Sequence, residues 1–213
     1  MTIDDEVTPA RERPAAERRR RMSPAERRRQ LLDLGLDLAR RLPPEDVTME
    51  VVAEAAGVSR GLMFHYFESK QDFHLAILRE QAGEMLALTR PPEGLEDPNE
   101  IALASLSAYV EYVEANPTAY SSLLRGALSG DPEIRAVTEE TRTEVARRVL
   151  AFAPAMGIDA SPMIEAAVMG WIAFVEEVMT RWIADPVMRR DQVLALITTS
   201  LLAIAGVAGS LEG

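Results

Sequence analysis

The sequence predicts an all-α protein of about nine helices, and three observations lead to this prediction. Alanine, leucine, glutamate and arginine, which favour helix, dominate the 213 residues, and aromatic residues make up only 5%. A capping residue followed by proline, or by an apolar run with helical spacing, recurs along the chain. No segment alternates apolar and polar side chains as a half-buried strand does.

The predicted helices begin at recognisable caps. Ser23-Pro24-Ala25-Glu26 is a capping box, and the helix that it opens is predicted to end at Pro43-Pro44. The predicted N-caps of the next three helices are Thr48, Ser59 and Ser69. The fourth helix is predicted to run to about Thr89. The later helices are predicted to begin at Asp97-Pro98, Asn116-Pro117, Asp131-Pro132 and Ser161-Pro162, with a ninth between Asp185-Pro186 and about Gly206.

Helix length and charge divide the chain into three parts. Residues 1–22 are predicted to be a basic disordered arm, residues 23–70 a helix-turn-helix domain, and residues 71–213 a larger helical body. The formal net charge is −11, but residues 1–80 hold 14 basic and 15 acidic residues, whereas the remainder holds 9 and 19. Arginines cluster ahead of the second helix at Arg11, Arg13, Arg18 to Arg21 and Arg27 to Arg29. A basic arm on an acidic body suits a DNA-binding protein, although a merely solvated tail is the alternative.

Residues 47–70 carry the most specific pattern, because they predict a helix, a tight glycine turn and a second helix. Val52 is predicted to face inward, Gly57 to take the left-handed conformation of the turn, and Met63 and Phe67 to share one inner face. The side chains left pointing outward are those of Arg60, Leu62, Phe64 and His65. This is the arrangement of a helix-turn-helix that reads the major groove, with an ordinary helical hairpin as the alternative.

The same positions resemble a known family. Thr48, Val52-Ala53, Ala56 to Gly61, His65-Tyr66-Phe67 and Ser69-Lys70 closely resemble the N-terminal signature of the tetracycline-repressor (TetR) family of bacterial transcriptional regulators. The resemblance covers about residues 25–75, and the remainder is similar only in length and helix count. It implies a homodimer that pairs through its last two helices, double-stranded operator DNA as a partner, and a small-molecule effector whose binding moves the heads and releases the DNA.

The resemblance also implies which residues contact DNA. The predicted set is Thr48, Ser59, Arg60, Gly61, Leu62, Phe64, His65, Tyr66 and Lys70. Thr48, Tyr66 and Lys70 would contact phosphates, and Arg60 would either read guanine or clamp a phosphate. Leu62 stands where a small hydroxyl residue is frequent, and Phe64 where tyrosine is usual. These two side chains would contact thymine methyl groups or lie partly buried in the head.

The body is predicted to hold an apolar cavity for a mainly hydrophobic or uncharged effector, with plain core packing as the alternative. The candidate lining residues are Met85, Tyr109, Tyr112, Tyr120, Leu124, Phe152, Trp171, Phe174 and Val178. Tyr109 and Tyr112 would offer their hydroxyls to a ligand. The last helix carries no charge between Gln192 and Gly206, so we expect a partner subunit to cover one side of it, although the centre of a monomer is the alternative.

Other classes of protein fit the sequence poorly. Cysteine is absent, the two histidines lack the spacing of a metal pair, and there is no glycine-rich phosphate loop or nucleophile elbow. Glu176 and Glu177 are adjacent on a helix and diverge by about 100°, so they do not converge for catalysis. We therefore expect no enzyme activity, metal or cofactor. The charged N-terminus and the lack of a long apolar run predict a soluble cytoplasmic protein without a membrane partner.

The sequence thus predicts a ligand-responsive transcriptional regulator, in the simplest case a repressor that leaves a palindromic operator when an effector binds. A regulator that activates is a further alternative. The alternative from another class is a helical small-molecule-binding or scaffold protein that does not read DNA, which the loss of hydroxyls at Leu62 and Phe64 would favour.

Overall fold

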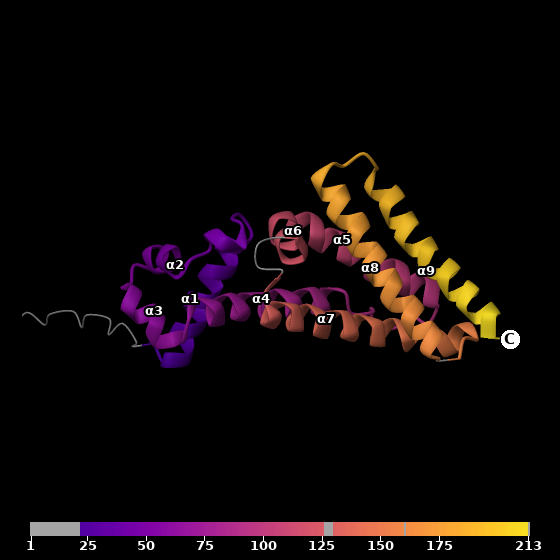
Figure 1. Cartoon of the computed structure of the whole chain (residues 1–213), viewed down its shortest axis with the longest axis horizontal. Coiled ribbons are helices and arrows are strands. Elements are labelled where there is room, and N and C mark those ends of the chain that lie inside the picture. The colour runs from indigo at the N-terminus through magenta and orange to yellow at the C-terminus, as the bar shows by residue number, and fades with distance from the viewer. Residues whose placement is uncertain (1–21, 126–129, 160, 213) are drawn as a thin grey trace, which may run out of the picture.

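The computed structural model describes residues 22–125, 130–159 and 161–212, and over these residues it is all-α (Figure 1). The helices are α1 (Pro24–Ala39), α2 (Met49–Ala56), α3 (Arg60–Tyr66), α4 (Lys70–Leu88), α5 (Pro98–Ala115), α6 (Pro117–Arg125), α7 (Pro132–Leu150), α8 (Pro162–Ala184) and α9 (Arg190–Glu212). The prediction of an all-α fold with about nine helices is confirmed.

Side-chain caps start most of these helices where the sequence predicted. In the predicted capping box, the Ser23 hydroxyl accepts the amide of Glu26, whose carboxylate in turn accepts the amide of Ser23. The other predicted N-caps that accept an amide from the first turn of their helix are Thr48, Ser59, Ser69, Asp97, Asp131 and Ser161. Each cap satisfies an amide that has no partner inside its own helix.

Two predicted helix ends were wrong. The first helix ends at Ala39 rather than at the two prolines, and the Arg41 amide there donates to the Leu38 carbonyl three residues earlier instead of four. The last helix passes through Gly206 and runs to Glu212. A glycine ends a helix when it adopts a positive φ, and among the described glycines only Gly57, Gly94 and Gly157 do so. Two short 3₁₀ turns, 44–46 and 153–156, were not predicted.

The first three helices and the start of α4 form a compact head around one core. Val52, Met63, Phe67 and Phe73 are completely buried there, which confirms the predicted inner faces of the second and third helices. Gly35 of α1 lets α4 approach closely, since a Cβ at this position would lie 2.7 Å from the Phe73 ring. The head is therefore sealed on the side that faces α4.

The body continues from the head along α4. Helices α4 and α7 lie side by side, and the antiparallel pair α8 and α9 stands at the end of the molecule farthest from the head (Figure 1). The indole N–H of Trp171 in α8 donates to the Ile197 carbonyl and to the Ser200 hydroxyl of α9, both at 3.1 Å, which fixes the pair. Across the described residues, no helix is long and apolar enough to span a membrane.

Most of the predicted basic arm, residues 1–22, lies outside the described residues, and so do Arg11, Arg13 and Arg18 to Arg21. The last three arginines of the predicted cluster belong to α1 and contact the protein itself. Arg27 donates to Gln30, while the guanidinium of Arg28 lies 4.7 Å from the centre of the Phe67 ring. Arg29 pairs with Asp33 and with Glu80 of α4. Arg28 and Arg29 therefore connect α1 to the end of α3 and to α4, whereas the contact of Arg27 lies within α1.

Candidate nucleic-acid interface and ligand cavity

The turn between α2 and α3 has the geometry that the sequence predicted. Gly57 adopts φ 64° and ψ 34°, its amide donates to the Glu54 carbonyl, and the amide of Val58 donates to the Ala53 carbonyl. This pair of hydrogen bonds is the Schellman arrangement, which needs a left-handed residue at the position of Gly57. Val58 then packs against the head core. The turn thereby fixes the direction in which α3 leaves α2.

Helix α3 presents an exposed face that is only partly polar. Arg60, Gly61, Phe64 and His65 are exposed, and Phe64 keeps 47% of its surface accessible. The two unusual positions differ, because Leu62 is half-buried whereas Phe64 faces outward. Leaving aside the backbone of its own helix and its chain neighbours, the atom nearest to a Cβ built at Gly61 is Ser59 Oγ at 3.9 Å, an ordinary contact, so nothing else in the described protein requires a glycine at this position.

Arg60 is held in place by two neighbours. Its Nε donates to the Glu50 carboxylate of α2 at 2.8 Å, and its guanidinium lies 5.5 Å from the centre of the Phe64 ring. Both contacts are exposed, so they orient the guanidinium without removing it from solvent. An arginine with an oriented fork is suited to a bidentate contact with guanine.

The other predicted DNA contacts lie at helix ends beside this face. Thr48 and Ser59 are occupied as N-caps of α2 and α3, Tyr66 ends α3 and is half-buried, and Lys70 begins α4 and is exposed. The amides at the start of α4 and the Lys70 ammonium together provide positive potential suited to a phosphate.

A buried histidine ties this head to α4. His74 Nε2 lies 3.0 Å from the carbonyl of Val47, the residue before Thr48, and because a carbonyl only accepts, Nε2 carries the proton. Burial lowers the pKa of His74, so its ring stays neutral at pH 7. Helix α4 therefore holds the entrance to α2 directly.

The body contains a partly open cavity of about 240 Å³ between α4 and the helices that follow it. Seven of the nine predicted lining residues border it: Met85, Tyr109, Tyr112, Tyr120, Leu124, Phe152 and Trp171. Phe174 and Val178 do not, and their assignment to the cavity was wrong. The cavity meets α8 along Val168, Trp171 and Val175, whereas Phe174 is 37% exposed and Val178 packs into the core of the body.

The tyrosine hydroxyls at the cavity are already used by the protein. Tyr109 and Tyr120 share a hydrogen bond of 2.6 Å, and Tyr112 donates to the Gln81 carbonyl at 3.1 Å. Burial raises the pKa of Tyr112 to about 12 and raises the pKa values of Tyr109 and Tyr120 above their ordinary range, so all three phenols are neutral. They shape the wall of the cavity more than they offer it free polar groups.

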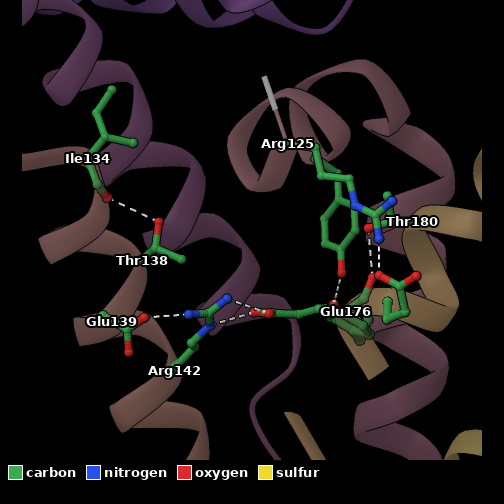
Figure 2. Close-up of polar contacts among 10 residues, drawn as sticks. Arg125, Ile134, Thr138, Glu139, Arg142, Glu176 and Thr180 are labelled. Carbon is green, nitrogen blue, oxygen red and sulfur yellow. Dashed lines mark hydrogen bonds and ion pairs between the residues drawn. The ribbon is translucent and has the colours of Figure 1, made fainter. Parts of the chain in front are cut away.

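An ion pair between α7 and α8 stands in the same wall (Figure 2). Arg142 donates from Nε to Glu176 at 2.9 Å and from a terminal nitrogen at 2.6 Å, and it also pairs with Glu139. The hydrogen bond to Glu176 is the main reason that the pKa of Arg142 is raised. Arg148 pairs with Glu144. Hydrogen bonds from Arg147 and Arg148 lower the pKa of Glu144 to about 2.

Sequence reasoning did not place the two lining arginines or Ser105 at the cavity. Arg142 and Arg148 belong to a helix rich in charge, which reads as solvated, and nothing in its spacing distinguishes them from their exposed neighbours. Ser105 is a single small polar residue in an apolar helix, and its position next to the cavity depends on how α5 packs.

Comparison with known proteins decides the family. A family model described as tetracyclin repressor-like, C-terminal domain, matches residues 98–204, which is half of the chain. A second model, described as bacterial regulatory proteins, tetR family, matches residues 31–77. The chain belongs to the TetR family. It is therefore a transcriptional regulator with a helix-turn-helix DNA-binding domain, which confirms the prediction from residues 47–70, and the family consists of regulators rather than enzymes.

Individual TetR-family proteins and other regulators resemble the chain over most of its length. The uncharacterized HTH-type regulator Rv0472c of Mycobacterium tuberculosis is 26% identical over 201 residues, covering 88% of this chain and 82% of that protein. A TetR-family regulator from Streptomyces coelicolor superposes with a TM-score of 0.79 at 24% identity, covering 89% of this chain and 85% of that one. The regulator FadR from Bacillus subtilis, solved with stearoyl-CoA, gives a TM-score of 0.62 at 14% identity, covering 83% and 97%. At these identities the solved structures support the fold alone.

Proposed function

We propose that this TetR-family chain is a ligand-responsive repressor, which binds a palindromic operator as a homodimer and leaves it when an effector occupies the cavity. The observation that carries the proposal is that one helix serves both sites. Helix α4 buries Phe73 and Ile77 in the head core, and farther along it places Gln81 and Met85 at the cavity. A ligand that moves α4 therefore moves the head.

The exposed face of α3 is proposed to enter the major groove. Arg60 reads a guanine there, with its fork oriented by Glu50 and Phe64, and the exposed Phe64 ring meets a thymine methyl group or a sugar. Contacts from Thr48, Tyr66 and Lys70 to phosphates set the register.

Dimerisation is proposed to use the outer faces of α8 and α9. Met163, Gly170 and Phe174 share one exposed face of α8, since they stand seven and then four residues apart. On α9, Leu196, Thr199 and Ala203 form a similar exposed stripe. Two copies packed about a two-fold axis would bury these faces in a four-helix bundle and place the two heads on successive half-sites.

Effector binding is proposed to act through α4. Effector and operator each favour a different separation of the two heads, so each weakens the binding of the other by the same coupling free energy. The solved complex of FadR from Bacillus subtilis with stearoyl-CoA supports the idea that a body of this fold accepts a ligand.

The test is selection of bound duplexes from random and genomic DNA by the purified protein at moderate salt. The mass of the protein in solution is measured alongside. We expect enrichment of a palindrome with half-sites about one helical turn or more apart. Recovery of no preferred sequence would refute operator reading and favour a ligand-binding scaffold.

The dimer is tested separately by sedimentation. Phe174→Glu should convert the protein to a monomer, because it places two charges in an apolar interface, whereas Leu88→Glu, at a site on α4 that is 55% exposed, should leave a dimer. A dimer that survives Phe174→Glu would move the interface elsewhere.

A further inference from the structure

Ser105 of α5 is the one hydroxyl at the described cavity wall that the protein leaves without a hydrogen-bond partner. Its Oγ is buried, and Ser105 borders the cavity beside Ile101, Leu106 and Tyr109. Burying a hydroxyl without a partner costs free energy that a ligand atom in the right place would recover.

The remaining hydroxyls of the wall show what is unusual about Ser105. Thr89, Thr138 and Thr141 each donate to the carbonyl four residues earlier in the helix, at 2.8 to 3.0 Å. The three tyrosines are bonded to each other or to a backbone carbonyl. Ser105 therefore stands apart from a set of groups that are already satisfied, and it is the wall hydroxyl with a hydrogen bond left to donate. Its Oγ has almost no accessible surface, so a ligand must turn the hydroxyl toward the cavity to accept that bond.

The charged side chains of the wall are satisfied as well. Arg142 is held by Glu176 and Glu139, and Arg148 by Glu144 and the Leu86 carbonyl. The Glu176 side chain is only 16% exposed. A ligand carboxylate that recruited Arg142 would leave this buried acid without its partner, which is costly in a poorly hydrated site. The wall thus disfavours an anionic ligand.

Apart from Gln81 of α4, the rest of the lining is aliphatic or aromatic. Helices α5 and α8 supply Leu106, Val168, Trp171 and Val175, and α4 supplies Met85. Such a surface binds apolar area, and directional binding rests on the few polar groups that remain.

We propose that the effector is an uncharged, mainly apolar molecule with one oxygen acceptor, a hydroxyl or a carbonyl group, and that Ser105 Oγ donates to this oxygen. The proposal rests on the proposed function, because it names the chemical class of effector for the same cavity. It differs from a fatty-acid or acyl-CoA ligand in requiring no anionic group at the cavity wall.

The experiment compares ten-carbon probes by calorimetry on the full-length protein without DNA. The probes are 2-decanone and decan-1-ol, which are neutral and carry one oxygen, and decanoate, which is anionic at pH 7.5. We expect both neutral probes to bind at least about tenfold more tightly than decanoate. Equal or tighter binding of decanoate, or binding of none of the three, would overturn the proposal.

Variants then test the role of each wall residue. Ser105→Ala should weaken the binding of 2-decanone by about three- to tenfold, which corresponds to the loss of one hydrogen bond, and should leave the binding of decanoate unchanged. The matched control is Thr143→Val, outside the cavity, which removes a hydroxyl that its own helix already satisfies and should change the binding of no probe. Glu176→Gln should strengthen the binding of decanoate, because it removes the charge that pairs with Arg142. Equal losses of 2-decanone binding in Ser105→Ala and Thr143→Val would refute the contact between Ser105 and the ligand.

The design separates this inference from the proposed function. Probe binding is measured without operator DNA, so it is independent of any effect on DNA binding. If the probes bind in the predicted order but none of them changes DNA binding, the ligand class is supported and the regulatory proposal is refuted. Release of DNA by decanoate alone would support regulation and refute the ligand class.

Discussion

The head and the body of this protein are both helical, yet one is packed solid and the other is hollow. In the head, Val52, Met63, Phe67 and Phe73 have no accessible surface, and Gly35 allows helices to touch closely. In the body, the helices surround a cavity of about 240 Å³. A solid head presents one fixed surface to DNA, whereas a hollow body can change its packing when a ligand enters. Under the proposed function, this contrast assigns DNA recognition to the head and ligand response to the body.

The largest expected effect tests whether the head core carries more stability than the cavity wall. Phe73→Ala should lower the free energy of unfolding by about 3–5 kcal/mol, because it leaves a void in a closed core. The matched control is Phe152→Ala, at a half-buried side chain that borders the cavity, where we expect less than half of that loss. Chemical denaturation measures both variants, and equal losses would break the comparison.

Adding volume should distinguish the same two regions. Ala53→Leu overpacks the head core and should cost about 1–3 kcal/mol of unfolding free energy. Ala102→Leu projects into the cavity and should cost less than about 1 kcal/mol while it weakens binding of the neutral probes. Denaturation and calorimetry on both variants test this. If Ala102→Leu were as destabilising as Ala53→Leu, the cavity would not be free space.

The exposed face of α3 should matter for binding and not for stability. Arg60→Ala should cost about 1–3 kcal/mol of binding to the selected operator and relax the preference at one base pair. Lys70→Ala should weaken binding to all DNA sequences alike and reduce the dependence of that binding on salt. Titrations at several salt concentrations separate the two, and unchanged base preference in Arg60→Ala would assign Arg60 to a phosphate instead.

The smallest effect concerns the junction between the regions. Because burial lowers the pKa of His74 below 6.5, the unfolded chain binds a proton before the folded one does, so the stability present above pH 6.5 falls as the pH drops below it. The slope contributed by His74 should not exceed about 1.4 kcal/mol per pH unit.

His74→Gln is the informative comparison for this slope, since a glutamine amide can still donate to Val47 without titrating. As the pH drops from 8 to 5.5, chemical denaturation should show a smaller loss of unfolding free energy in His74→Gln than in the original protein. Identical pH profiles of the two proteins would mean that titration of His74 does not contribute to the pH dependence of stability.

Prediction from sequence succeeded where neighbouring residues decide the outcome. The caps, the left-handed Gly57 and the inward Met63 and Phe67 follow from interactions within a few residues, and the helix-turn-helix signature combines them at fixed spacing. It failed at Gly206, because a glycine that does not adopt a positive φ does not end a helix. It also misplaced Phe174, because helical spacing defines a face but not what that face contacts.

The sequence by itself therefore determined the helices, the reading head and the family of this protein, since caps, turns and apolar periodicity are local properties of the chain. Only the tertiary structure decided that Arg142 meets Glu176, that His74 meets Val47, and that Ser105 keeps an unpartnered hydroxyl at the described cavity wall. The partners in each of these pairs lie 27 or more residues apart, and the surroundings of Ser105 come from several helices. Such contacts depend on how the whole helices pack, which no local pattern specifies.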